Sequence, residues 1–164
     1  MSECTEELVS LMRKHFNYLF AQYRFKVIHA ESYWEGEYCF IVLESSVCRV
    51  QMDYQLGSID LYFGTLSAPL SMAEEGLGYD GWYSVRHVVD FLEDKPTNLA
   101  EILAEGKVLR SLSTSDRLAY WSARLEPVCE EVIDLFREES VEQRKRLDEY
   151  IKQSLREIRR QLNE

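Results

Sequence analysis

Residues 38–63 read YCFIVLESSVCRVQMDYQLGSIDLYF, and most of this stretch repeats its apolar residues with a period of two. Residues 38–44 are almost continuously apolar, which is typical of a central strand covered on both faces. Apolar and polar residues then alternate over 48–55, and they alternate again over 59–63 after a glycine-serine turn at 57–58. These three runs predict three successive strands joined by short turns.

A fourth strand and a covering helix are predicted before this stretch. Residues 25–32 are rich in β-formers, and the turn at 34–37 joins them to the next strand. Short connections between successive strands imply an antiparallel meander of four strands. Residues 5–23 form one apolar helical stripe, with Thr5 as the expected N-cap. This helix is the expected cover for the apolar face of the sheet.

The second half of the chain is predicted to be helical. After an irregular stretch at 64–81, Ser84 is expected to cap a helix that runs to Leu92. From Pro96 onward the pattern predicts a short helix that ends near Gly106, a helix that starts at Ser113 or Ser115, and a helix that starts at Ser140. Pro127 is expected either to kink the helix that starts at Ser113 or Ser115 or to begin a new helix at its first position. We therefore expect an α+β protein, with a sheet domain at 1–95 and a helical extension at 96–164. The extension packs either on the sheet domain or on a partner.

The last predicted helix carries a stripe that suggests oligomerisation. It is expected either to fold back on residues 128–136 or to pair with another copy in a homodimer. Interruptions at Arg144 and Asp148 argue against a long coiled coil. The residues of the stripe are Leu147, Ile151, Leu155, Ile158 and Leu162.

Charge is unevenly distributed along the chain. The net charge is −10, but residues 137–164 hold eight basic and seven acidic residues, so the excess of acid lies in residues 1–136. An acidic surface repels phosphates, which disfavours nucleic-acid and anionic-membrane binding and favours a basic protein partner. The alternative interpretation is that the acidity only maintains solubility.

No motif predicts a cofactor or a metal. Residues 76–81 spell G-x-G-x-x-G before a helix, but no parallel β-α-β unit surrounds them and nearby acids would repel a pyrophosphate. The four cysteines form no C-x-x-C pair, and Cys39 and Cys48 are expected to be small core residues. The acidic N-terminus does not resemble a signal peptide, so a cytoplasmic location is expected.

No catalytic residue is assigned from the sequence. The histidines His15, His29 and His87 have no serine or cysteine in a known nucleophile motif near them. Such pairs are defined in space, so the fold could still assemble one. A deep polar pocket that held a histidine beside a carboxylate would favour an enzyme.

The segment before the second predicted helix is the candidate binding site for a protein partner. It combines aromatic residues with acids, as interaction hot spots do. For Trp82, a plug at the end of the core is an equal alternative. The candidate residues are Glu74, Glu75, Tyr79, Asp80 and Trp82.

The order of segments in residues 5–95 resembles a group of known proteins. A helix leads to YRFKVI at 23–28, VLES at 42–45, a strand pair broken at Gly57, and GWYS at 81–84 before a helix that ends VVDFL at 88–92. This order resembles small uncharacterised bacterial α+β proteins, some of which are similar to toxin-immunity proteins. The resemblance implies a protein-binding role without catalytic residues.

Three functions therefore follow from the sequence. The leading one is a non-enzymatic binding module with an acidic surface, for example an immunity-type inhibitor of a basic partner. The alternatives are a homo-oligomeric structural or adaptor protein that uses its C-terminal helices, and an enzyme whose site is assembled from dispersed residues.

Overall fold

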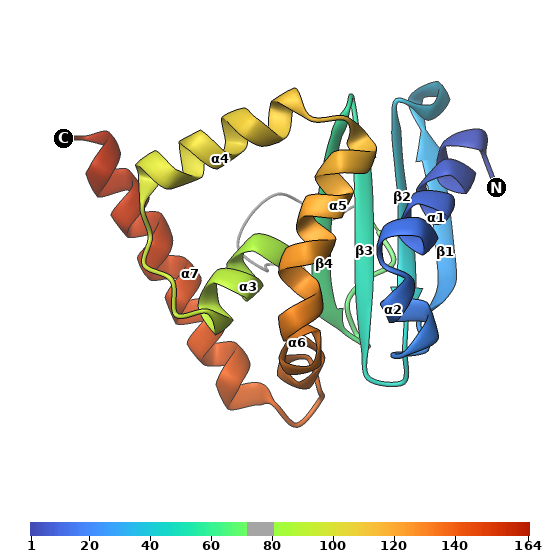
Figure 1. Cartoon of the computed structure of the whole chain (residues 1–164). Helices are drawn as coiled ribbons and strands as arrows, with labels where there is room; N and C mark the ends of the chain where they lie inside the picture. The colour runs from blue at the N-terminus through green and yellow to red at the C-terminus, as the bar shows by residue number, and fades with distance from the viewer. Residues whose placement is uncertain (72–80) are drawn as a thin grey trace.

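The computed structural model describes residues 1–71 and 81–164 and contains one antiparallel sheet with helices on one side (Figure 1). The strands follow one another across the sheet in chain order, so each is paired with its neighbour in the sequence. They are β1 (Lys26–Tyr33), β2 (Tyr38–Glu44), β3 (Cys48–Gln55), β4 (Ser58–Thr65) and β5 (Trp82–Ser84).

Helices precede the sheet and make up the second half of the chain, which confirms the α+β class. Helices α1 and α5 lie over one face of the sheet, and α7 lies on the far side of α3 (Figure 1). The α-helices are α1 (Glu3–His15), α2 (Asn17–Ala21), α3 (Val85–Leu92), α4 (Leu99–Ser111), α5 (Thr114–Leu125), α6 (Cys129–Leu135) and α7 (Val141–Leu162). Short 3₁₀ turns occur at Trp34–Gly36 and Glu126–Val128.

The sheet has five strands where the sequence predicted four. The fifth, β5, pairs with β4, with Trp82 opposite Gly64. Three residues are too few to show a period of two, so only the long-range pairing reveals this strand. Gly64 is needed here, because a Cβ at this position would lie 2.7 Å from the Cβ of Ala68 and 2.9 Å from Cε3 of Trp82.

Several predicted helix boundaries differ from the structure. The first helix breaks at Phe16, whose ψ of 36° is not helical, and Ser2 rather than Thr5 caps it. Phe16 is fully buried, so the break lets a large ring enter the core. Helix α4 continues beyond Gly106 to Ser111, because an isolated glycine costs a helix only about 1 kcal/mol.

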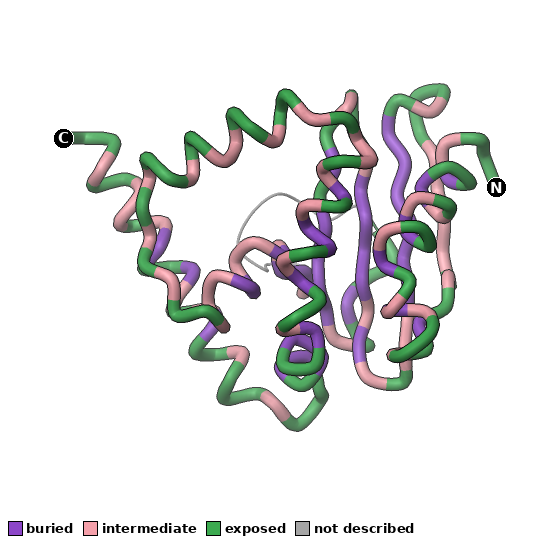
Figure 2. Tube along the Cα trace, viewed as in Figure 1, coloured by how far each residue is buried: buried purple, intermediate pink, exposed green. Residues whose placement is uncertain are grey.

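The main core fills the space between the sheet and the helices. The face of β2 that carries Cys39, Ile41 and Leu43 lies in this core, together with residues of α1, α5, α6 and α7. Buried segments accordingly concentrate where the helices approach the sheet (Figure 2). One apolar cluster thus contains residues from both halves of the chain.

The opposite face of the sheet holds a second cluster, which includes Tyr38, Phe40 and Trp82. The prediction that β2 is covered on both faces agrees with this arrangement, because six of its seven residues are buried. Polar residues of β3 are buried here as well: Gln51 is fully buried and Asp53 is 6% exposed. The Asp53 carboxylate accepts hydrogen bonds from Nε2 of Gln51 at 2.8 Å and from the hydroxyl of Tyr38 at 3.2 Å.

A disulfide joins Cys4 of α1 to Cys39 of β2 across 35 positions of sequence. Cys39 is buried, as expected of a core residue, but the sequence did not reveal its bond to Cys4. Cys48 and Cys129 are buried free thiols. The disulfide therefore fixes the start of α1 to the sheet.

Candidate functional site

Only one residue of the predicted partner-binding segment lies within the described part of the chain. Glu74, Glu75, Tyr79 and Asp80 lie outside the described residues. Trp82 is 4% exposed, and its Nε1 donates a hydrogen bond to the carbonyl of Pro69 at 3.0 Å. Of the two roles considered for Trp82, the structure therefore shows packing.

The predicted oligomerisation stripe is divided along α7. Leu147 and Ile151 are buried within the chain, Leu155 and Ile158 are half-buried, and Leu162 is 66% exposed. Helix α7 folds back along α3 and α4 (Figure 1). Only the last turns of the stripe therefore remain accessible to a second copy.

The fold does bring one histidine to a serine. Nε2 of His15 lies 2.7 Å from Oγ of Ser115, which connects the end of α1 to the start of α5. Burial lowers the pKa of His15, and Asp116 opposes this effect through space. Within residues 1–71 and 81–164, no carboxylate hydrogen-bonds this ring as it would in a catalytic triad. We interpret the pair as a contact between two helices.

His87 lines a small polar cavity between α3, α4 and α7, the kind of pocket that would favour an enzyme. The cavity also contains Asp90, Lys95 and Glu105, and its volume is about 80 Å³. Pockets for small-molecule ligands usually measure about 300–1,000 Å³, so this cavity is small for a substrate. Burial lowers the pKa of His87, and the charge of Asp90 opposes this effect.

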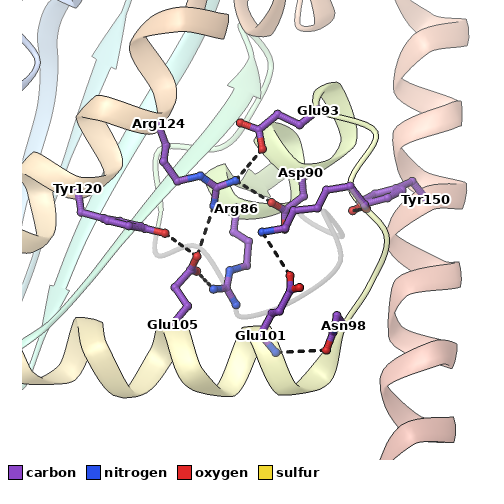
Figure 3. Close-up of polar contacts among 10 residues, drawn as sticks. Arg86, Asp90, Glu93, Asn98, Glu101, Glu105, Tyr120, Arg124 and Tyr150 are labelled. Carbon is purple, nitrogen blue, oxygen red and sulfur yellow. Dashed lines mark hydrogen bonds and ion pairs between the residues drawn. The ribbon is translucent and has the colours of Figure 1, made fainter.

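Arginines neutralise the carboxylates around this cavity (Figure 3). Nη2 of Arg124 lies 2.8 Å from Oδ1 of Asp90, and Nη1 of Arg124 lies 3.6 Å from Oε2 of Glu105. Glu105 also pairs with Arg86 and accepts a hydrogen bond from the hydroxyl of Tyr120 at 2.5 Å. Because α4 has no buried residue, this polar network is its main attachment to α3 and α5. The cluster therefore has a structural explanation.

A larger, open hollow lies between the start of α1 and the adjoining end of the sheet, and we call it the N-terminal hollow. Its volume is about 570 Å³. The charged residues that line it are the exposed glutamates Glu3, Glu7 and Glu35. None of the three has an ion pair in the described structure. The other lining residues are Ser2, Cys4, Leu8, Leu11, Ser32, Gly36, Tyr54 and Thr114.

Two exposed aromatic residues lie on the opposite face of the sheet from this hollow, where their rings contact Tyr38 and Phe40 of the second cluster. Tyr33 and Trp34, directly before Glu35, are 42% and 60% exposed. Tyr33 stacks on Phe40, with ring centres 6.4 Å apart and planes 13° apart, so its orientation is fixed. Tyrosine and tryptophan are enriched at the energetic centres of protein interfaces. Exposed aromatic residues and unpaired acids therefore occupy opposite faces at the same end of the sheet.

A second groove, between α3, α6 and α7, has mixed charge. Its volume is about 590 Å³, and Phe91 and Leu135 provide apolar walls. The carboxylates Glu131 and Asp134 face the groove together with Arg146, and Asp134 pairs with Arg137 at 2.7 Å. The positive charge of Arg146 would weaken the attraction of a basic ligand to these carboxylates. In the N-terminal hollow, by contrast, all the charged lining residues are acids.

The sequence analysis missed the residues that form the N-terminal hollow. Glu3 and Glu7 stand one helical turn apart on α1, and Trp34-Glu35-Gly36 was interpreted only as a turn. The available signal was an exposed aromatic residue next to acid in a tight connection. The disulfide, which places α1 beside that turn, gave no signal in the sequence.

Metal and membrane sites were also sought in the described ranges. In residues 1–71 and 81–164, no three His, Cys, Asp or Glu side chains converge as a metal site would require. Over the same ranges, no helix has both the length and the apolar character needed to cross a membrane.

Comparisons with known proteins identify no relative. No protein-family model, curated protein or solved structure matches this chain.

Proposed function

We propose that this chain is a non-enzymatic module that binds a basic protein, with immunity-type inhibition of a basic toxin as one concrete form. The observation that supports the proposal best is the N-terminal hollow, whose charged lining residues are three unpaired glutamates. A lysine or arginine of a partner would lay its aliphatic stem on Leu8 and Leu11 and place its charge among the carboxylates. Such complementarity raises association rates and selectivity more than it raises affinity.

The exposed aromatic residues supply what the charges lack. Salt screens exposed charge pairs, and such pairs contribute little affinity on their own. Tyr33 and Trp34 add large apolar area on the opposite face of the same end of the sheet, and the stacking of Tyr33 lowers the entropy cost of ordering it. A partner that covers both features would gain binding energy from the rings and orientation from the acids.

The proposal is tested with the purified protein encoded by the neighbouring gene. Binding is measured by calorimetry at about 50 mM and about 300 mM salt, and we expect affinity to fall with salt because the Debye length shortens. The triple variant E3Q/E7Q/E35Q should weaken binding at low salt by about tenfold, equivalent to 1.4 kcal/mol.

A matched control separates the effect of the hollow on binding from the effect of the net charge of the chain. The variant E130Q/E139Q/E149Q changes net charge by the same amount at exposed positions outside the hollow. We expect it to lower affinity by less than threefold. Salt-insensitive binding, or an equal loss in both triple variants, would contradict a role for the hollow, and absence of binding would count against this partner and the immunity-type form.

A further inference from the structure

Strand β1 lies at the edge of the sheet, since its only neighbour in the strand order is β2. None of its eight residues is buried. An edge strand presents a row of backbone N–H and C=O groups that another strand can pair with. The outer side of β1 is therefore a possible site for strand addition.

Proteins usually protect such edges, and β1 has more protecting features in its first half than in its second, where Glu31 is the one acidic residue. Its first half has Lys26 and a register shift between Val27 and His29, two features that disfavour an added strand. From His29 to Tyr33 the register against β2 is regular. The less protected half is thus the one that leads to Trp34 and the N-terminal hollow, and the charge of Glu31 there disfavours an acidic strand more than a basic one.

The geometry also connects the edge with the hollow. Ser32 pairs with Cys39, whose side chain lies in the main core, and Ser32 itself lines the hollow. Neighbouring strands lie about 4.8 Å apart, and directly opposite residues share a face of the sheet. A residue opposite Ser32 on an added strand would therefore point to the face that carries Glu3 and Glu7.

We infer that an extended segment of a basic partner adds to the edge of β1 over residues 29–33 and directs a lysine or arginine into the N-terminal hollow. The inference rests on the proposed function, and it specifies the binding mode. Backbone hydrogen bonds would supply affinity, while the hollow would select a basic side chain at one of every two positions. Tyr33 and Trp34 would pack against the end of the added segment.

The probe is the blocked peptide TKTKTKT, which places all its lysines on one face when extended. Titration into the isotope-labelled full chain, followed by amide chemical shifts, should move the signals of residues 29–36 and of the start of α1. The variant E3Q/E7Q/E35Q should raise the dissociation constant at least fivefold, and the peptide TETETET should not bind.

Two methylated peptides test the strand itself without altering the protein. In a strand, the N–H groups of alternate residues point to the same side, so methylation of the three lysine amides and methylation of the last three threonine amides give two isomers that block opposite edges. Strand addition predicts that one isomer binds at least tenfold more weakly and that the other binds like the parent peptide. Equal binding of both isomers, or shifts confined to the α3–α6–α7 groove, would overturn the inference.

The remaining outcomes are also decisive. If the parent peptide does not bind at millimolar concentration, the inference fails. It also fails if the signals of β1 move with protein concentration alone, because β1 then pairs with a second copy of the chain. If salt-dependent binding in the hollow persists but methylation has no effect, strand addition fails while the proposed function stands. If the neighbouring protein binds without any dependence on Glu3, Glu7 and Glu35, the proposed role of the hollow fails first.

Discussion

Replacing the buried Asp53 by asparagine should stabilise the protein at neutral and alkaline pH. Burial, with a smaller contribution from the charge of Asp60, raises the pKa of Asp53 from 3.8 to about 7. The hydrogen bonds from Gln51 and Tyr38 oppose this shift but do not cancel it. An asparagine keeps the shape of the side chain and has no charge to desolvate, while its amide can donate to the Tyr38 hydroxyl.

The sign and size of the effect follow from proton linkage. A carboxyl whose native pKa lies above its unfolded pKa holds its proton more tightly in the folded state, so it lowers stability as pH rises. With pKa values of 3.8 and about 7, Asp53 alone should cost the wild type about 2–3 kcal/mol between pH 5 and pH 8. The total penalty above pH 8 approaches about 4 kcal/mol, at 1.36 kcal/mol for each pH unit between the two pKa values.

Urea unfolding of wild type and D53N at several pH values between 5 and 8.5 measures this difference. The other titrating groups, including His15 and His87, occur in both proteins, so their effects cancel in the comparison. D94N, at an exposed position after α3, controls for the exchange itself. The reasoning is refuted if the stability difference between D53N and wild type stays constant to within about 0.5 kcal/mol over this range.

Three further predictions concern stability. Removal of the disulfide in C4S/C39S should lower the free energy of unfolding, measured with urea, by about 3–4 kcal/mol, because the bond closes a loop of 35 positions in the unfolded chain. Thiol titration of the native wild type should find Cys48 and Cys129 protected from the reagent. Gly64→Ala should destabilise by about 1–3 kcal/mol, because its Cβ would press on Ala68 and Trp82, and a neutral result would contradict that close approach. Leu147→Ala should cost about 2–5 kcal/mol, whereas Leu162→Ala should change stability by less than about 0.5 kcal/mol, so equal losses would contradict the division of α7.

The regular strands could be predicted because their pattern is local. The limits predicted for the second strand agree with β2, and the alternation over 48–55 coincides with β3. The prediction also placed Gln51 and Asp53 on the face opposite Met52. It failed to predict their burial, because a period of two indicates which residues share a face but not whether another segment covers that face.

Long-range contacts account for the features that were missed. β5 depends on pairing with β4, and the disulfide depends on α1 lying over β2. The extension of α4 is supported by ion pairs from Glu105 to α3 and α5, which a local pattern around Gly106 does not reveal. In each case the structural role of a residue depends on a contact with a residue far away in the sequence, which a local pattern does not reveal.

The candidate site shows the same dependence on topology, and it explains why function was harder to predict than fold. The pattern identified the first strand, but only the strand order shows that β1 lies at an edge. The acidic excess was evident from composition, yet its binding role depends on α1 and the turn after β1 enclosing one hollow. An edge strand or an acidic surface alone would indicate little, since the first is normally protected and the second often only maintains solubility. Their meeting at Ser32, with two exposed aromatic rings on the opposite face of the same edge, is what favours a basic, extended partner over a purely structural interpretation.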